Sequence, residues 1–356
     1  MLSHVRRRIV SSLQWISPRF LYWALSCYHP VKAYFFLKKY PGMVTAGPCI
    51  VLVAGEDGPD KLSVYKPVYA VYKTLRQHFN VHLSVHRSFN ERHARRIAQM
   101  RPDLVLLSFD SGVFQQIFEH YRIPLMGSLS QTCMTCYDKV GAKEIVRRHG
   151  IATAPWISVR KGEPMQNILD KLRFPLVIKP RRAGSSKGLS KVQSPKELEK
   201  AIRKALKWDT EVIAEAYISG REYTCTVYGN ENPQTLPLNR KIMRFEREEL
   251  EARGEKILKS RYPVISDEPF VEEIHELSKR IYAIFHCRDM IRIDWKYDDA
   301  ARLLYFIEVN ILPWIGRNGG NIEDCARAAG SSYDEFIINL FKDALRRNER
   351  ENGIRK

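Results

Sequence analysis

The 356-residue chain has no regular cysteine spacing and no long uninterrupted apolar run. Its seven cysteines stand at irregular intervals, which does not suit a disulfide framework, so a reducing, cytoplasmic setting is expected. A membrane-spanning helix needs about 18–20 consecutive apolar residues. The apolar stretches near the amino terminus are interrupted earlier, by Pro18-Arg19 and by His29-Pro30, and none leads to a small-residue cleavage site. We therefore expect neither a membrane span nor a signal peptide.

Several short motifs are also missing. No GxGxxG follows the first predicted strand, which argues against a dinucleotide site there. No Gly-x-Ser-x-Gly elbow supports hydrolase chemistry, and no RRM, KH or helix-turn-helix signature supports a nucleic-acid binder. Cys133 and Cys136 have metal-like spacing, but no second cysteine or histidine pair lies near them in the sequence. Buried packing is therefore favoured over zinc for this pair.

Acidic residues are outnumbered overall and absent from the first 47 positions. The chain has 58 Lys and Arg against 40 Asp and Glu, a formal net charge of +18. This excess favours an acidic partner but does not decide the fold. Residues 1–47 combine basic residues with many aromatic ones. Two interpretations stay open for this segment: a helical arm with solvated cations, or a surface that contacts an anionic membrane or an acidic protein.

From Pro48 onward, strand-like apolar runs alternate with segments of helical period. The runs 49–58 and 103–109 are typical of buried parallel strands. Strands that alternate with helices predict a parallel, doubly wound α/β sheet. Further along, the pattern predicts a single helix over 136–151. Residues 247–263 are rich in charge and poor in apolar periodicity, which predicts a long, mobile loop.

Residues 174–192 combine two apolar strands with a glycine- and serine-rich loop that carries Lys179, Arg181, Arg182 and Lys187. Cations so close together repel one another. Either the loop is simply solvated, or a strongly anionic group lies beneath it. In the second case, the backbone N–H groups of the glycine-rich turn can approach a phosphate closely. The stretch then predicts a hairpin whose loop and four cations cover a phosphate group.

Residues 290–310 predict a second hairpin, in which two apolar strands flank a polar turn. With a period of two, Arg292 and Asp294 share one face of the first strand, and Glu308 and Asn310 share one face of the second. If the two faces coincide, two carboxylates and one amide oxygen converge, which is a ligand set that Mg²⁺ prefers. The alternative is a sheet face held by salt bridges alone.

Taken together, these elements resemble a known family. The stretches FPLVIKPRRAGSSKGLSKV, EVIAEAYISGREYT and RIDWKYD…YFIEVN, preceded by PLMGSLSQTCMTCYDKVGAK, are similar to consecutive motifs of the ATP-grasp superfamily, in particular the D-alanine–D-alanine ligases. The resemblance covers about residues 48–348 and implies an α/β ATP-grasp fold. The implied units are a basic, aromatic arm (1–47), an N-terminal parallel α/β domain (48–135), a central α+β lid domain (136–214) and a C-terminal α+β catalytic domain (215–356).

The resemblance also implies ATP and two Mg²⁺ ions as cofactors, with Mn²⁺ as an alternative metal. It assigns Lys139, Lys179 and Ser186 to the ATP phosphates, with Glu222 on the ribose. The hinge formed by Glu215, Ala216, Tyr217 and Ile218 would receive adenine. The metal ligands would be Asp294, Glu308 and Asn310, and Arg292 would stabilise charge on the reacting carboxylate. Ser185 and Tyr262 would help to close the lid over the substrate, and Arg261 stands where the family usually has lysine.

Departures from the family pattern fall mainly in the substrate pocket. Pro59 occupies the place of the glutamate that binds the first substrate's ammonium group in D-alanine ligases. Trp314 replaces a glycine, Gly319 stands near a serine position, and Arg317 could offer a new clamp for a carboxylate or phosphate. In the hinge, Ala216 stands where lysine is common. The candidate substrate residues are Glu56, Trp314, Arg317, Asn318 and Gly319.

The leading interpretation is an ATP- and Mg²⁺-dependent, ADP-forming carboxylate–amine ligase that works through an acyl phosphate and has a rebuilt substrate pocket. Its substrates would be an amino acid or another small carboxylate and an amine, either free or bound to a carrier protein. The alternatives are a genuine D-alanine–D-alanine ligase and a non-catalytic ATP-binding regulator. Further expectations are a homodimer and a cytoplasmic location, peripheral to the membrane if the arm docks there.

Overall fold

The computed structural model describes residues 47–55, 65–86, 89–108, 112–242, 263–313, 315–317 and 321–351. Its strands are β1 (Cys49–Gly55), β2 (Asn80–His86), β3 (Leu104–Leu107), β4 (Trp156–Arg160), β5 (Leu176–Pro180), β6 (Ser190–Val192), β7 (Glu211–Ala216), β8 (Arg221–Tyr228), β9 (Gln234–Thr235), β10 (Leu238–Lys241), β11 (Val264–Ile265), β12 (Met290–Asp298) and β13 (Leu303–Asn310). Its helices are α4 (Tyr65–Leu75), α5 (Glu91–Gln99), α6 (Val113–His120), α7 (Ser130–Tyr137), α8 (Lys139–Arg148), α9 (Gln166–Leu169), α10 (Pro195–Ala205), α12 (Val271–Ile284), α13 (Asn321–Ala328) and α14 (Tyr333–Glu351). Residues 1–46 of the predicted arm, and all but the last residue of the predicted loop over 247–263, lie outside the described residues.

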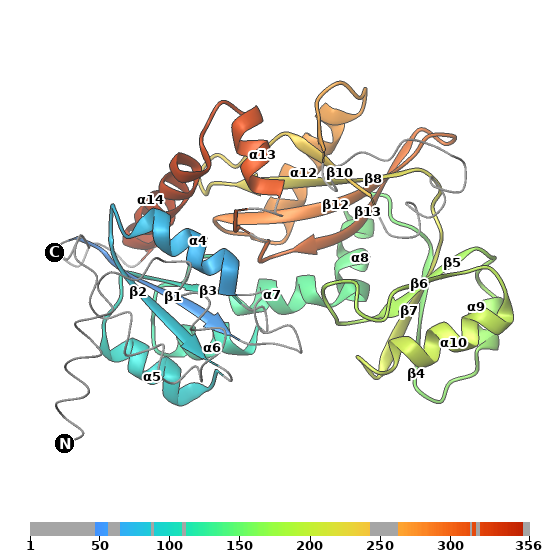
Figure 1. Cartoon of the computed structure of the whole chain (residues 1–356). Helices are drawn as coiled ribbons and strands as arrows, with labels where there is room; N and C mark the ends of the chain where they lie inside the picture. Colours follow the sequence, from blue (N-terminus) through green and yellow to red (C-terminus); the bar gives the residue numbers. More distant parts are fainter. Residues whose placement is uncertain are drawn as a thin grey trace, which may run out of the picture.

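The first sheet is parallel and three-stranded, in the order β2-β1-β3, as the alternation of strands and helices predicts. Successive side chains of a strand point to opposite faces. Ile50 and Leu52 of β1 accordingly pack with α4 on one face, whereas Val51 and Val53 pack with α5 and α6 on the other. Burial on both faces explains why this strand is a continuous apolar run. Figure 1 shows the helices on either side of the sheet.

The second sheet is antiparallel, in the order β4-β7-β5-β6. Strands β5 and β6 form the hairpin that the sequence predicts over 174–192. Helix α10 covers one face, where its buried Leu198 and Ala201 belong to the same apolar cluster as Leu176 of β5. The helix begins after Ser194, whose hydroxyl accepts a hydrogen bond from the backbone N–H of Glu197. The hairpin loop is thereby attached to a small unit with its own core.

The third sheet has the order β11-β10-β8-β12-β13, with β9 paired to β8. Strands β12 and β13 form the predicted antiparallel hairpin. Their register places Arg292 opposite Asn310 and Asp294 opposite Glu308. The pairs therefore stand directly across from each other, as the period of two predicts. A register shift follows Asp294, so the alignment holds only for this end of the hairpin.

Helix α8 is the helix that the sequence predicts over 136–151, and it is preceded by α7. They meet at Asp138, whose backbone is extended. The Asp138 carboxylate accepts hydrogen bonds from the backbone N–H groups of Val140 and Gly141. An aspartate in this role begins a new helix, so the predicted helix is confirmed but starts at Lys139 and ends at Arg148, three residues inside each predicted end. Helix α8 then contacts β13, which brings its lysines toward the third sheet.

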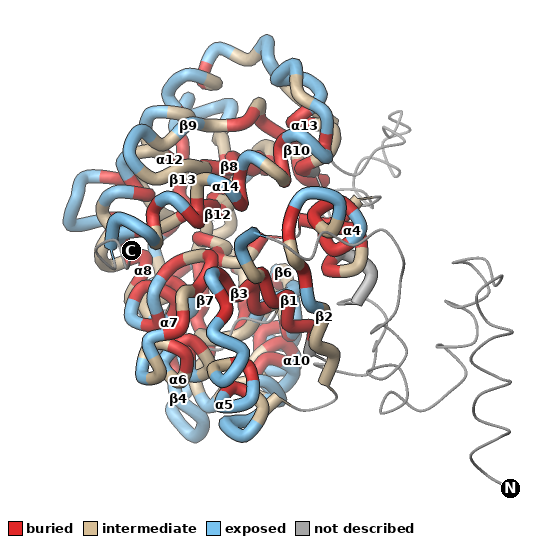
Figure 2. Tube along the Cα trace, turned by 90° about the vertical axis from the view of Figure 1, so that its left-hand side faces the viewer, coloured by how far each residue is buried: buried red, intermediate tan, exposed pale blue. Residues whose placement is uncertain are grey.

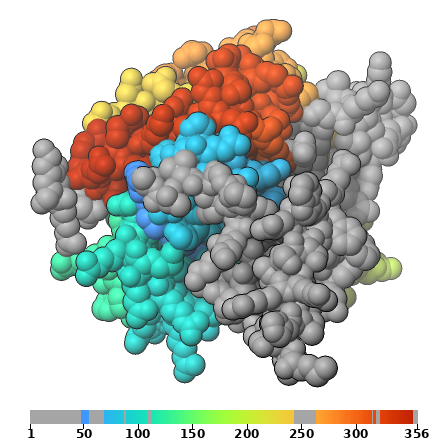
Figure 3. Space-filling model, turned by 60° about the vertical axis from the view of Figure 1, so that its left-hand side comes forward, coloured from blue at the N-terminus to red at the C-terminus, as the bar shows by residue number. Residues whose placement is uncertain are grey.

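The C-terminal helices return to the first sheet. Helix α14 contacts α4 and β3, and its buried Phe336, Ile337 and Phe341 share one apolar cluster with Ile50 of β1. Figure 3 shows the C-terminal helices lying against α4, and Figure 2 shows the buried residues gathered where the strands and the covering helices meet. Among the described helices, none is both long and apolar enough to cross a membrane.

Candidate active site

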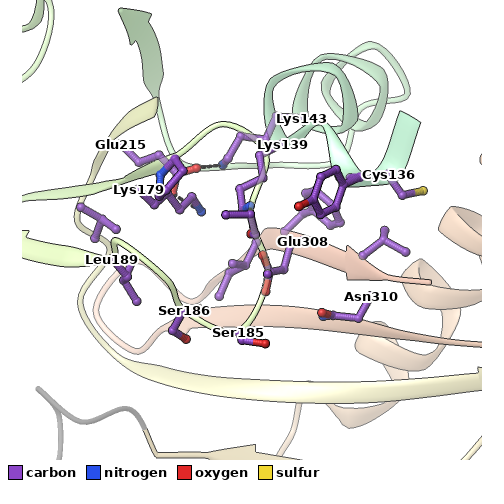
Figure 4. A pocket seen from close by; sticks show the side chains of 18 of the residues that line it. Cys136, Lys139, Lys143, Lys179, Ser185, Ser186, Leu189, Glu215, Glu308 and Asn310 are labelled. Atoms are coloured by element: carbon purple, nitrogen blue, oxygen red, sulfur yellow. Dashed lines mark hydrogen bonds and ion pairs between the residues drawn. The ribbon is translucent and has the colours of Figure 1, made fainter. Parts of the chain in front are cut away.

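A cavity of about 650 Å³ lies between the second and third sheets. Its walls come from strands of both sheets, from the loop between β5 and β6, and from the junction of α7 and α8. The sequence-predicted residues along it are Lys139, Lys179, Ser185, Ser186, Glu215, Ala216, Tyr217, Ile218, Glu222, Glu308 and Asn310. Figure 4 shows many of these side chains directed into the same space. The structure thus brings together residues that lie more than 170 positions apart in the chain.

Glu215 lies near the end of β7, where a buried charge needs counter-ions. Lys179 on β5 places its Nζ 3.0 Å from Oε2, and Lys143 on α8 places its Nζ 3.2 Å from Oε1. Burial would raise the pKa of Glu215, but the two lysines lower it. Burial lowers the pKa of Lys143 to about 8, because Glu215 compensates only in part. These three residues, here called the Glu215 cluster, carry one net positive charge.

Sequence reasoning missed Lys143, although a signal was present. Lys139 and Lys143 are four residues apart on α8, and this spacing puts both side chains on one face. Lys139 donates a hydrogen bond from Nζ to the carbonyl oxygen of Ala183, at 2.6 Å. Burial lowers the pKa of Lys139, and the charge of Glu308 opposes that shift. Lys139 therefore joins the hairpin loop to the start of α8 at the cavity wall.

The cations of the hairpin loop are placed differently from the prediction. Arg181 donates hydrogen bonds to Asp138 at 2.6 Å and to Glu211 at 2.9 Å. Arg182 also donates to Asp138, at 3.2 Å, and neither arginine lines the cavity. The prediction that all four loop cations cover an anion is therefore wrong for the two arginines, because protein carboxylates neutralise them. Lys179 and Lys187 do line the cavity.

The loop backbone is folded back tightly over β5. Ser185 and Ser186 have φ angles of 56° and 55°, in the left-handed region that few residues other than glycine adopt. Gly188 has a φ of +71°, and a Cβ there would lie 2.9 Å from Pro180. Only glycine avoids that clash and that strain. The sharp turn keeps both serines on the wall of the cavity.

Asp294 is fully buried on β12, and both of its oxygens contact cations. Arg292 donates from Nε to Oδ1 at 2.7 Å and from Nη2 to Oδ2 at 3.1 Å. Lys241 Nζ lies 2.8 Å from Oδ2 and 2.5 Å from Oε1 of Glu222. Burial would raise the pKa of Asp294, but the two cations lower it to about 2. These four side chains, here called the Asp294 cluster, carry no net charge, and sequence reasoning missed Lys241.

Glu308 and Asn310 project from β13 into the cavity (Figure 4). Within the described part of the chain, the Glu308 carboxylate forms no hydrogen bond or ion pair, and the buried Nδ2 of Asn310 has no hydrogen-bond partner. The carboxylate oxygens of Glu308 and the amide Oδ1 of Asn310 are hard ligands of the kind that a divalent cation prefers, whereas the Nδ2 group of Asn310 can only donate, to a phosphate oxygen or to water. In the same residues, no three His, Cys, Asp or Glu side chains form a metal site by themselves. An ion here would also need ligands from phosphate or water. The assignment of Asp294 as a third ligand stays a prediction.

Arg317 does not line the cavity. Its guanidinium forms an ion pair with Asp334 and lies 4.5 Å from the centroid of the Tyr333 ring. A protein carboxylate already neutralises this charge, so its position gives the predicted clamp no support. The other predicted residues that lie outside the described residues are Glu56, Arg261, Tyr262, Trp314, Asn318 and Gly319.

The described lining of the cavity is positively charged. It contains the six lysines Lys139, Lys143, Lys179, Lys187, Lys241 and Lys296, against the three glutamates Glu215, Glu222 and Glu308. A concave wall with an excess of one sign of charge concentrates ligands of the opposite sign. In the hinge, Tyr217 also lines the cavity, and its ring has Lys191 Nζ 3.8 Å from the centroid. The cavity therefore suits a ligand that carries several negative charges.

Comparison with known proteins gives a consistent result. Residues 145–342 match the family model described as D-Ala D-Ala ligase C-terminus. A D-alanine–D-alanine ligase of Clostridium beijerinckii is 29% identical over 240 residues, which cover 67% of this chain and 77% of that relative. D-alanine–D-alanine ligase A of Bacillus cereus is 30% identical over 253 residues, with 67% and 78% covered.

The solved structures that resemble this chain have the same fold. The D-alanine–D-alanine ligase of Bacillus anthracis, in complex with ATP, has a TM-score of 0.72 at 25% identity, covering 86% of this chain and 100% of that structure. The VanG D-Ala:D-Ser ligase of Enterococcus faecalis has a TM-score of 0.69 at 22% identity, covering 84% and 100%, which is a likeness of fold alone.

Proposed function

Since this chain belongs to the D-alanine–D-alanine ligase family and has its ATP-grasp fold, we propose that the cavity between the second and third sheets is where it binds ATP and joins a carboxylate to an amine. Family membership makes the protein an ATP-dependent, ADP-forming carbon–nitrogen ligase that uses a divalent metal. Its substrates are a small carboxylate and an amine. The residue roles and the substrate identity are the proposal.

The proposed reaction has two steps. A substrate carboxylate attacks the γ-phosphate of ATP, which gives an acyl phosphate and ADP. The amine then attacks the activated carbonyl, and phosphate leaves. Both steps depend on aligning the reactants and neutralising negative charge rather than on a protein nucleophile. A cavity with a surplus of buried cations suits that requirement.

The nucleotide roles follow the position of each side chain. We assign Lys179 and Lys139 to the phosphates, because both ammonium groups line the cavity beneath the hairpin loop. Ser185 and Ser186 bring loop backbone N–H groups to the same place. The hinge from Glu215 to Ile218 receives adenine, and Glu222 binds the ribose. Arg292, with Tyr262 from outside the described residues, completes the proposed set around the reacting carboxylate, and Arg261, also outside them, is assigned to the nucleotide.

A divalent ion, with Mg²⁺ preferred and Mn²⁺ as a substitute, would be held by Glu308 and Asn310. When bound, it would neutralise phosphate charge and orient the phosphate oxygens. The observation that carries the whole proposal is the combination, on one cavity, of the Glu215 cluster and of Glu308, whose carboxylate forms no hydrogen bond or ion pair within the described residues and lies beside Asn310. The first suits the phosphates and the second suits their metal.

For the substrate, we propose an acid and amine pair other than two D-alanines, with one member either free or attached to a carrier protein. The support is sequence-based: Pro59, Trp314 and Gly319 depart from the family pattern where D-alanine would bind. The described lining of the cavity also includes Ser108, Tyr137 and Leu312, which bear no charge. A genuine D-alanine–D-alanine ligase remains the alternative.

A screen for ADP formation tests this proposal. The full chain is incubated with ATP, Mg²⁺ and pairs of amino acids or peptides, with D-alanine as the first arm, and each product is identified by mass. We expect ADP release only with a specific acid and amine, and little with D-alanine alone. Efficient formation of D-alanyl-D-alanine would instead support the genuine ligase. Nucleotide binding without turnover for any pair would support a non-catalytic regulator. The arm, a homodimer and a peripheral location stay predictions.

A further inference from the structure

Lys241 is a buried cation that no assigned role explains. It ends strand β10 and lines the cavity. Its Nζ lies between Glu222 on β8 and Asp294 on β12, at 2.5 Å and 2.8 Å. The Lys241 side chain is 11% exposed, and the two carboxylates are 8% and 0% exposed. A lysine in this place joins three strands of the sheet through one ammonium group.

Asp294 has little capacity left for another ligand. Each of its oxygens already accepts at least one hydrogen bond from a cation, and its side chain is not part of the cavity lining. Glu308, directly opposite Asp294 in the β12–β13 register, differs in its contacts and in its access to the cavity. It lines the cavity and forms no hydrogen bond or ion pair within the described residues. Two carboxylates that the sequence pattern predicts as equivalent metal ligands therefore have different surroundings.

We infer that Lys241 takes the place of one of the two metal ions that the sequence predicts, so that Asp294 serves as its counter-ion and a single divalent ion, held by Glu308 and Asn310, accompanies the nucleotide. This inference rests on the proposed function and deepens it. Lys241 is then a positioning residue. Its ammonium group holds two carboxylates in place: Glu222, which is assigned to the ribose, and Asp294, which serves as its counter-ion. Arg292, on the same carboxylate, keeps that side of the cluster neutral without a metal.

Electrostatics favours this arrangement over two metals. A divalent ion on Asp294 would stand within a few ångströms of two resident cations, Lys241 and Arg292, and would be repelled by both. Displacing Lys241 from Asp294 instead would leave its ammonium with one ion-pair partner, Glu222, in place of two, at a site where its side chain is only 11% exposed. Lys296, which faces Glu222 across the β8–β12 register, adds a further positive charge nearby. Lys139 and Lys241 also lie near Glu308, but neither forms an ion pair with it within the described residues, so a metal ion at Glu308 displaces no existing ion pair.

The test counts metal ions rather than turnover. The full chain is titrated with Mn²⁺ in the presence of a non-hydrolysable ATP analogue, with bound Mn²⁺ measured by electron paramagnetic resonance and bound nucleotide measured separately by calorimetry. We expect one Mn²⁺ per bound nucleotide for the wild-type chain. For Lys241→Met, which frees Asp294, we expect a second Mn²⁺. Lys241→Arg, which keeps the charge, and Lys200→Met, at an exposed lysine on α10 that is not in the cavity lining, should each stay at one.

Two bound Mn²⁺ ions of comparable affinity in the wild-type chain would overturn the inference while leaving the proposed function intact. A count that stays at one in Lys241→Met would overturn the role given to Lys241. Asp294→Asn offers a second check if Lys241→Met does not fold: the Mn²⁺ count and the Mn²⁺ affinity should both match those of the wild-type chain, whereas weaker Mn²⁺ binding would show that Asp294 is a metal ligand. Absence of nucleotide binding in the wild-type chain would overturn the proposed function together with the inference.

Discussion

Two buried carboxylates flank the cavity, Glu215 on the second sheet and Asp294 on the third, and each is neutralised by two cations. The clusters differ in what surrounds those cations. Lys143 and Lys179 share Glu215 alone, so the Glu215 cluster has a surplus positive charge. In the Asp294 cluster, Lys241 also contacts Glu222, so the charges balance. One cluster can therefore accept an anion, whereas the other is already complete.

The pKa shifts of the two buried lysines follow this difference. Burial lowers the pKa of Lys143 to about 8, because one shared carboxylate does not offset the loss of water. Burial acts in the same direction on Lys241, but Asp294 and Glu222 together raise its pKa above the ordinary lysine value. Burial alone thus does not decide the charge of a lysine in this protein. The number of carboxylates within contact distance decides it.

The largest expected effect comes from removing the shared carboxylate. Glu215→Gln leaves Lys143 and Lys179 buried without an acid, and breaking a buried ion pair in this way typically costs about 3–5 kcal/mol of unfolding free energy. Asp294→Asn should cost less, because Lys241 keeps Glu222 as a partner. Urea unfolding of the full chain measures both values.

Glu199→Gln is the matched control for the carboxylate substitutions. Glu199 forms an exposed pair with Arg203 one helical turn away, and such pairs contribute about 0–1 kcal/mol. We expect a loss within that range for the control. Equal losses for Glu215→Gln and Asp294→Asn would show that the two clusters are equivalent and would remove the contrast drawn between them.

The next effect concerns nucleotide affinity. Lys179→Ala removes one of the two cations of the Glu215 cluster and with it the surplus charge. We expect a loss of about 100-fold in affinity for ATP, equivalent to about 2.7 kcal/mol, with ADP formation abolished. Lys200→Ala, an exposed lysine on α10, is the control and should bind ATP like the wild-type chain. Unchanged affinity in Lys179→Ala, measured by calorimetry, would contradict the assignment of this residue to the phosphates.

The sequence predicts the local part of this arrangement well. Arg292 opposite Asn310 and Asp294 opposite Glu308 follow from a hairpin with a period of two. The parallel first sheet and the β5–β6 hairpin follow from local patterns in the same way. In the two hairpins the residues concerned lie on one strand or on two strands joined by a loop, whereas the parallel sheet follows from the alternation of strands and helices along the chain. Local patterns suffice because the chain itself fixes which strands are neighbours.

The contacts that decide the charge of each cluster are not local. Lys241 reaches Asp294 across β8, and the two residues are 53 positions apart. Arg181 is neutralised by Asp138, 43 positions away, so its charge does not serve an anion as the loop sequence suggests. A pattern along one strand does not reveal its neighbours in the sheet. Counter-ions of this kind can be assigned only once the sheet order is known.

The smallest expected effect is a pH dependence of stability. An unfolded lysine has a pKa of about 10.4, whereas that of folded Lys143 is about 8. Between these values the unfolded chain holds a proton that the folded chain has lost, so the contribution of Lys143 to stability rises with pH and is smallest below pH 8. Lys143→Met removes this contribution. From pH 8 to pH 10, the unfolding free energy of the wild-type chain should rise by about 1–3 kcal/mol relative to the variant.

Urea unfolding at several pH values, with Lys200→Met as the exposed control, measures that difference. The control should run parallel to the wild-type chain, because an exposed lysine has no reason to lose its proton early. If Lys143→Met also ran parallel, Lys143 would keep an ordinary affinity for its proton in the folded chain. The pKa of Lys143 would then not be lowered by burial beside a single carboxylate. In that case the number of carboxylates within contact distance would not explain how the Glu215 cluster differs from the Asp294 cluster.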